Sequence, residues 1–283
     1  MRYVENRGVV IPQIGFGAWT FGDNPNNKEN EINTVLYGIN NFSMTLIDTA
    51  EMYGSGKSEG VVKEIIKKTG RNKLFIVDKI LPNNATKGNF LNRCKKSLET
   101  LDIDCIDLYL LHWRANVDLQ TVVDEMEDLV SRGLIKHWGV SNFDVKDMEE
   151  LFKCKNGKNC FCNQVLYNVG VRGPEFDLIP WCEKNEVLFM AYSPLYGGKE
   201  EREKITKLDC FAKLAKKENM TPEALMLNFV VSNKNIVTIF KTSSIDHLKG
   251  NMENVFKEID IASKEEIDAL FNPPVKKHRL KAI

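Results

Sequence analysis

Short apolar runs alternate with amphipathic segments along nearly the whole chain. The runs lie at residues 13–19, 45–50, 74–80, 106–112, 137–142, 162–168, 187–193 and 236–242. Continuous hydrophobicity over so few residues is typical of strands buried on both faces of a parallel sheet. Eight strand–helix units in 283 residues predict an α/β fold, a (β/α)₈ TIM barrel, with an open doubly wound sheet as the alternative. No linker divides the chain, so we expect a single domain over residues 1–283.

The amphipathic segments carry recognisable helix ends. A helical pattern over residues 119–132 stops at Gly133, which suits the position after a helix C-terminus. Thr221 followed by Pro222 predicts an N-cap with proline in the first turn. Ser263 followed by Glu266 predicts a capping box that opens a last helix.

The two ends of the chain lie outside the eightfold pattern. Residues 3–4 and 9–10 flank a turn with Asn6 and Gly8, which predicts an N-terminal β-hairpin at the bottom of the barrel. At the other end the chain has a short C-terminal tail. Its basic stretch, residues 276–281, is interpreted as a solvated segment.

Composition narrows the function classes. Lys+Arg and Asp+Glu both number 39, which gives no general attraction to nucleic acid or to a membrane surface. The first residues lack the apolar core of a signal peptide, and no run approaches the length of a membrane span. The seven scattered cysteines suggest reduced thiols and a cytoplasmic protein, and Cys154, Cys160 and Cys162 lack the paired spacing of a zinc site, so no metal is expected.

Polar side chains are concentrated where the predicted strands end. Because active sites of barrel enzymes lie at the carboxyl ends of the strands, these residues predict one polar funnel. The residues in question are Asp48, Lys79, His112, Ser141, Asn142, Gln164, Tyr192, Ser193, Lys241 and Thr242. His137 is different, since it opens a predicted strand, and we interpret it as structural.

Three of these positions, together with Tyr53, suggest acid chemistry. Asp48 and Lys79 come from neighbouring strands and could form an ion pair, with Tyr53 in the loop after Asp48. An adjacent ammonium would lower the pKa of the phenol, and His112 could orient a carbonyl oxygen toward it. Since none of these groups is a reductant, a hydride has to come from a cofactor. Taken singly, each has a structural alternative, namely a turn cap, a snorkelling lysine, loop packing and a core histidine.

Three other motifs give weaker signals. Residues 54–58 resemble part of a P-loop, but Glu51 occupies the place of its first glycine. Residues 15–20 lack the third glycine of a dinucleotide fingerprint. An aldolase with Lys79 as Schiff-base former is a further alternative, although Asp48 would keep that amine protonated.

Together these segments resemble the aldo-keto reductase family over nearly the whole chain, and its bacterial, methylglyoxal-reducing members in particular. The matching segments are residues 15–19, 47–54, 107–113, 138–143, 163–165, 192–195 and 241–251. The resemblance implies NADPH bound across the barrel mouth and Asp48, Tyr53, Lys79 and His112 as the catalytic tetrad. It further implies roles for two groups of residues. Cofactor contacts would come from Ser141, Asn142, Gln164, Tyr192, Ser193, Leu195, Lys241, Thr242, Ser243, His247 and Asn251, and pocket walls from Trp19 and Trp113.

The sequence departs from the family pattern in four places. His247 stands where many members have an arginine for the 2′-phosphate, so NADH becomes a possible but weaker cofactor. Gly250 replaces an acid often found beside the adenine, and Arg114 replaces a proline. The short tail suggests an open pocket and broad substrate choice.

The predicted activity is NADPH-dependent reduction of small aldehydes and α-dicarbonyl compounds to alcohols. Its partners would be small carbonyl substrates, with neither nucleic acid nor membrane, and the resemblance favours a monomer. The alternative is a regulatory or binding protein on the same scaffold that senses the cofactor, which the complete tetrad disfavours.

Overall fold

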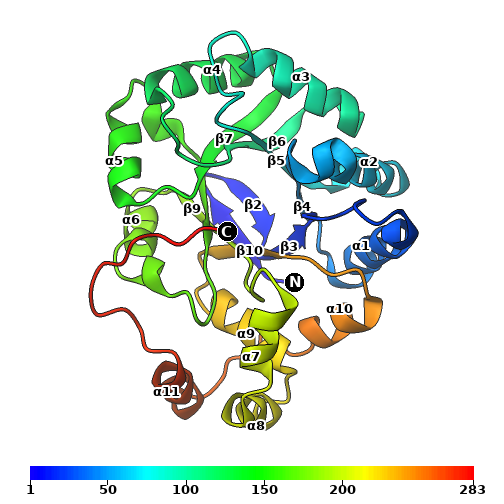
Figure 1. The fold of residues 1–283 in the computed structure, drawn as a ribbon, viewed down its shortest axis with the longest axis vertical. Coiled ribbons are helices and arrows are strands. Elements are labelled where there is room, and N and C mark those ends of the chain that lie inside the picture. Colours follow the sequence, from blue (N-terminus) through cyan, green and yellow to red (C-terminus); the bar gives the residue numbers. More distant parts are fainter.

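Eight parallel strands close into a barrel in the computed structural model, which describes residues 1–283. The strands follow the order β10-β3-β4-β5-β6-β7-β8-β9, so the predicted barrel is confirmed and the open sheet is wrong (Figure 1). They are β3 (Ile14–Gly17), β4 (Leu46–Asp48), β5 (Phe75–Ile80), β6 (Ile106–Leu111), β7 (Ile135–Ser141), β8 (Cys162–Leu166), β9 (Leu188–Tyr192) and β10 (Ile236–Phe240). Since β7 begins at Ile135, His137 lies inside the strand and does not open it.

Helices surround the barrel, one after each strand in the repeating units (Figure 1). These are α1 (Lys28–Phe42), α2 (Lys57–Thr69), α3 (Phe90–Leu101), α4 (Leu119–Ser131), α5 (Val145–Lys153), α6 (Leu178–Lys184), α9 (Pro222–Val231) and α10 (Ile245–Met252). Three more are additions to the repeat, namely α7 (Lys199–Thr206), α8 (Asp209–Lys217) and α11 (Ile261–Leu270). The longest, α1, has 15 residues, and no helix is long and apolar enough to cross a bilayer.

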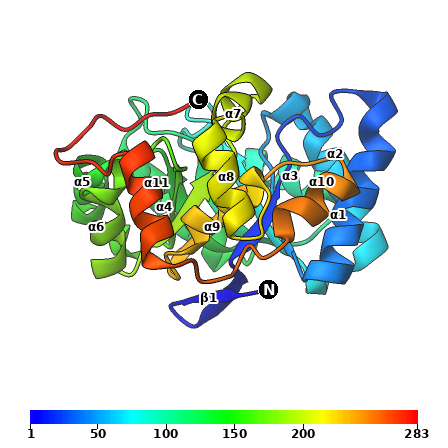
Figure 2. The same ribbon diagram turned by 90° about the horizontal axis from the view of Figure 1, so that it is seen from below.

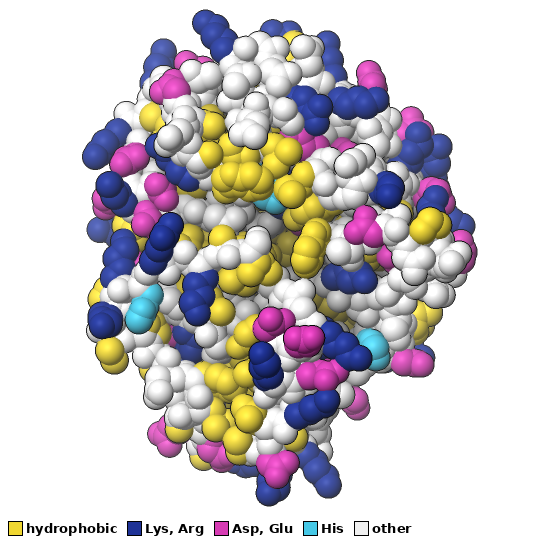
Figure 3. Space-filling view, in the orientation of Figure 1, with side chains coloured by type: hydrophobic (Ala, Val, Ile, Leu, Met, Phe, Trp, Pro, Cys, Tyr) yellow, Lys and Arg dark blue, Asp and Glu magenta, His cyan; other side chains and the backbone are white.

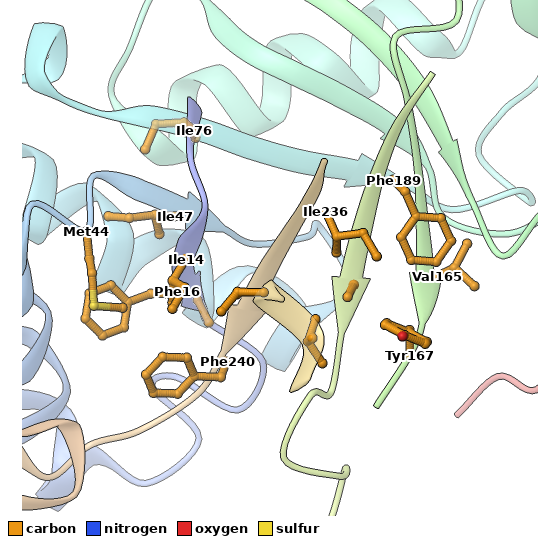
Figure 4. Close-up of a cluster of buried hydrophobic side chains, with 14 of the residues drawn as sticks. Ile14, Phe16, Met44, Ile47, Ile76, Val165, Tyr167, Phe189, Ile236 and Phe240 are labelled. Carbon is orange, nitrogen blue, oxygen red and sulfur yellow. The ribbon is translucent and has the colours of Figure 1, made fainter. Parts of the chain in front are cut away.

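Alternate side chains of the strands belong to two separate hydrophobic cores, one inside the barrel and one between the strands and the helices. On β6, Leu108 and Leu110 point into the barrel, whereas Tyr109 and Leu111 face the helices. The outer core between strands and helices is the larger of the two, and Figure 4 shows part of it around Phe16. This two-sided burial explains why the strands are almost uninterrupted apolar runs.

A hairpin of β1 (Tyr3–Asn6) and β2 (Val9–Pro12) covers the amino-terminal end of the barrel. Its Val4 and Ile11 belong to the core inside the barrel. Figure 2 shows the hairpin at the face opposite to the one that the end of the chain reaches. The predicted plug is therefore confirmed, and it leaves the other end of the barrel as the open one.

The predicted helix ends are confirmed in two cases and wrong in one. Gly133 has φ +71° directly after α4, and Thr221 caps α9 by accepting a hydrogen bond from the backbone of Ala224. Ser263, however, lies within α11. The N-cap is Asp260, whose carboxylate accepts from the Ser263 backbone at 2.6 Å, while the Ser263 hydroxyl donates to Glu218.

Candidate active site

A cavity of about 540 Å³ opens at the carboxyl end of the barrel, and most of the predicted site residues line it. Figure 3 shows hydrophobic side chains gathered around the hollow near the centre of this face. The lining includes Trp19, Asp48, Tyr53, His112, Trp113, Ser141, Asn142, Gln164, Tyr192, Ser193, Leu195 and Lys241. A larger hollow of about 720 Å³ lies between residues 169–178 and the tail, but none of the four tetrad residues lines it.

An ion pair forms the floor of the cavity. The Lys79 ammonium donates to Asp48 Oδ2 at 2.6 Å and to the Thr49 carbonyl oxygen at 2.8 Å. Both side chains of the pair are almost fully buried, because β4 and β5 are neighbouring parallel strands whose inward residues meet at the barrel end. Burial lowers the pKa of Lys79, but Asp48 and Tyr53 outweigh that effect and hold it above its usual value. Lys79 therefore remains a cation.

Tyr53 lies above this pair, on a tight turn between β4 and α2. The turn, η2 (Tyr53–Gly56), has left-handed backbone at Gly54 and Ser55. The Lys79 ammonium lies 3.3 Å from the Tyr53 hydroxyl. Burial raises the pKa of Tyr53 more than Lys79 lowers it, so the expected net lowering is wrong. The phenol therefore keeps its proton at neutral pH and can donate it.

His112 stands at the side of the cavity next to Tyr53, with the two ring centroids 5.7 Å apart. Burial, together with the nearby Lys79, lowers the pKa of His112 to about 3, so its imidazole is neutral. Its Nδ1 atom is buried without a hydrogen-bond partner. A buried N–H without a partner costs more than an unused lone pair, so we assign the proton to Nε2. This tautomer gives the cavity a neutral hydrogen-bond donor.

A shelf of amide and hydroxyl groups lies opposite the tetrad, at the ends of β7, β8 and β9. Asn142 donates to the Ser141 hydroxyl at 3.2 Å and accepts from the Tyr192 hydroxyl at 2.9 Å. Ser141 in turn donates to the Gln164 carbonyl oxygen at 2.8 Å. Asn142 and Ser193 have φ of +60° and +51°, a strained conformation that is common at binding sites. The shelf therefore presents an apolar ring face and several amide groups to one ligand.

The remaining predicted cofactor residues lie beyond the cavity, on one edge of the barrel. Lys241 follows β10, is exposed, lines the cavity edge and makes no ion pair. Thr242 is buried and Ser243 is half-buried in the loop before α10. His247 is exposed in the first turn of that helix, and Asn251 is buried further along it. The structure thus places these residues on one loop and helix but brings only Lys241 to the cavity.

Several cavity residues were absent from the sequence prediction, namely Thr20, Met52, Tyr196, Arg202 and Ile283. Arg202 belongs to the charged helix α7, which as a sequence reads like a solvated surface. Ile283 belongs to the tail, which was expected to leave the pocket open. Figure 1 shows the end of the tail at the barrel mouth, so the tail supplies part of one wall of the cavity, and the expected breadth of substrate choice stays a prediction. No periodic signal in the sequence marks either residue.

The chain belongs to the aldo/keto reductase family, whose sequence model matches residues 13–272. A polar tetrad at the mouth of a closed parallel barrel is the arrangement that the sequence resemblance predicted. Family membership makes the protein an oxidoreductase, and the small carbonyl compound is the substrate class of the family.

Individual relatives extend the similarity over almost the full chain. Methylglyoxal reductase YeaE of Escherichia coli (strain K12) is 38% identical over 267 residues, covering 94% of this chain and 93% of that protein. A crystal structure of an aldo/keto reductase from Klebsiella pneumoniae, in complex with NADP and acetate, has a TM-score of 0.95 and 35% identity. The match covers 100% of this chain and 99% of that one. A thermostable aldo-keto reductase, Tm1743, in complex with the inhibitor epalrestat, has a TM-score of 0.84 and 32% identity, covering 95% of this chain and 100% of that one.

Proposed function

We propose that the protein reduces small aldehydes and α-dicarbonyl compounds to alcohols with NADPH. The observation that carries the proposal is the chain Asp48–Lys79–Tyr53 beside neutral His112, because it presents a proton donor and an orienting N–H to one point of the cavity. The similarity to proteins named methylglyoxal reductases supports the choice of substrate.

Each residue of the tetrad has a role in this proposal. His112 Nε2 donates to the carbonyl oxygen and turns it toward Tyr53. Bound NADPH supplies the hydride that adds to the carbonyl carbon. Tyr53 gives its proton to the oxygen, and the Lys79 ammonium, 3.3 Å away, stabilises the phenolate that is left. Asp48 keeps Lys79 charged through the transfer.

The donor set at the cavity fits NADPH. Ser141, Asn142 and Gln164 offer groups for a carboxamide, and the Tyr192 ring is available to stack on a flat heterocycle. Lys241, with no acid paired to it, suits the 2′-phosphate, with Thr242 and Ser243 beside it. Ser193 and Leu195 would contact the pyrophosphate region, and Asn251 the adenine.

Tyr53→Phe tests the catalytic proposal. It removes the proton donor and one hydroxyl only, so turnover of methylglyoxal or a nitrobenzaldehyde should fall by at least about 10²- to 10⁴-fold. Affinity for NADPH, measured by fluorescence titration, should stay within a few-fold of wild type. Near-normal turnover in the variant would refute the assignment. Tight NADPH binding by the wild type without turnover of any carbonyl would favour the regulatory alternative.

Lys241→Ala tests the cofactor preference. Loss of a charge-assisted contact should weaken NADPH roughly 10- to 100-fold while NADH changes little. His247, which is exposed and cannot make a bidentate contact, would leave Lys241 as the main source of the preference. An equal loss for both cofactors would contradict the 2′-phosphate role.

A further inference from the structure

Gln164 belongs to the shelf of amide and hydroxyl groups, and it also contacts the carboxylate of Asp48. The side chain is almost fully buried on β8, and its Nε2 atom donates to Asp48 Oδ1 at 2.7 Å. An ionised carboxylate only accepts hydrogen bonds, so the amide nitrogen has to be the atom that faces Asp48. The Gln164 amide oxygen is then left for the cavity, which this residue lines.

Asp48 in turn determines where the ammonium lies. The three Nζ hydrogens of Lys79 are directed to Asp48 at 2.6 Å, to the Thr49 carbonyl oxygen at 2.8 Å and to the Tyr53 hydroxyl at 3.3 Å. The contact with Tyr53 is the longest of the three. A small rotation of the Asp48 carboxylate would therefore change it first. Gln164 is the side chain that opposes this rotation, since it occupies the second carboxylate oxygen.

We propose that Gln164 is a positioning residue for proton transfer, acting through Asp48 and Lys79 on Tyr53. Without its N–H, Oδ1 of Asp48 has no partner in a buried site and turns toward the ammonium, drawing it away from the phenol. The inference rests on the proposed reduction, and it adds a coupling between cofactor binding and the alignment of the proton donor. A ligand amide held by the Gln164 oxygen would fix the same side chain that aligns the proton donor.

The first test is read without cofactor or substrate. Tyrosinate absorbance, taken as the difference between each protein and its own Tyr53→Phe version, gives the pKa of Tyr53. In Gln164→Met this pKa should rise by about one unit, because Lys79 stabilises the phenolate less. Ser141→Ala is the matched control. It alters the same shelf without contacting Asp48, so NADPH affinity should fall while the Tyr53 pKa stays as in wild type.

The second test uses Gln164→Glu, which keeps the size and shape of the side chain. When protonated, the introduced carboxyl group can donate to Asp48 and restore the contact. When ionised, it repels Asp48. The kcat of this variant at saturating NADPH should thus approach wild type at low pH and fall at least about 10-fold as the pH rises, well below the pH at which ionisation of Tyr53 slows the wild type.

Two results would overturn the inference. One is an unchanged Tyr53 pKa in Gln164→Met with only NADPH affinity lost. The other is a wild-type pH profile for Gln164→Glu. Either would leave Gln164 as a cofactor contact alone. Failure of the proposed function is distinct, since the wild type would then oxidise no NADPH with any aldehyde, while the Tyr53 titration could still be measured.

Discussion

Two buried polar pairs lie on opposite faces of the same strand, β5. They differ in how the charge of each buried side chain is compensated. Lys79 points into the barrel and meets Asp48, a residue of opposite charge. Asp78, the preceding residue, points toward the helices and meets Glu59 of α2, a residue of the same kind. All four side chains are at most 3% exposed.

In the inner pair burial raises the pKa of Asp48 more than Lys79 lowers it, but the ammonium lies in direct contact and balances the carboxylate. The outer pair has no cation in contact, so its charge is balanced only if one of the two acids keeps a proton. Burial raises the pKa of Asp78 well above its usual value, and the carboxylate of Glu59 raises it further. Glu59 Oε1 and Asp78 Oδ2 have no hydrogen-bond donor while both groups are ionised. We infer that one proton, held by one acid and donated to the other, satisfies both atoms. The difference shows that burial works against charge in both pairs, and that a buried charge is kept only where the opposite charge is already in place.

Lys79→Met should break the inner pair with the largest effect on stability. It leaves Asp48 buried without its counter-ion, which costs about 3–5 kcal/mol in the free energy of unfolding. Urea denaturation measures this loss. The double variant Asp48→Asn/Lys79→Met should lose less free energy of unfolding than the two single variants lose together, because no charge remains uncompensated. A loss below about 1 kcal/mol in Lys79→Met would mean that the pair is not a balanced ion pair.

Asp78→Asn should raise the free energy of unfolding at high pH, whereas Lys79→Met lowers it. A folded pKa above the ordinary value of 3.8 gives a contribution that is complete below 3.8 and is lost as the pH rises through the raised value. In this window stability falls by up to about 1.4 kcal/mol per pH unit. Asparagine accepts no proton and can donate to Glu59, so the slope should shrink and the variant should be more stable than wild type at alkaline pH.

Asp107→Asn is the control for this prediction. Asp107 is a buried acid on the neighbouring strand β6, but it pairs with Arg71 at 2.6 Å and with Lys136 at 2.7 Å. Its replacement should lower stability at neutral and alkaline pH. If Asp78→Asn behaves in the same way as Asp107→Asn, Asp78 does not share a proton with Glu59.

The sequence predicted the inner pair but not the outer one, for a physical reason. Asp48 and Lys79 each stand near the end of an apolar run, and the ends of parallel strands meet at one face, so their proximity follows from the fold. Asp78 and Glu59 meet only through the packing of α2 on β5. No spacing in the chain reports which helical side chain faces which strand residue.

Energies that depend on burial were likewise beyond the sequence. The charge of Lys79 suggested a lowered pKa for Tyr53, but the enclosure of the phenol has the larger effect. The position of Ile283 in the cavity was also beyond the sequence, because it depends on the path of the tail over the barrel. The eightfold pattern predicted the ends of the strands to within two residues because each strand is buried on both faces.

Tyr109→Phe should have the smallest effect on the free energy of unfolding. It can be compared directly with Tyr53→Phe, since each substitution deletes one hydroxyl. Tyr109 lies on the outer face of β6, and burial, followed by the charge of Asp78, raises its pKa well above the usual value. Its hydroxyl is buried without a partner. Removing an unpaired hydroxyl should therefore change the free energy of unfolding by no more than about 0.5 kcal/mol, or raise it slightly, and leave turnover unchanged. A loss above about 1 kcal/mol would instead mean that Tyr109 donates to the Asp78 carboxylate, which would make the outer pair a group of three.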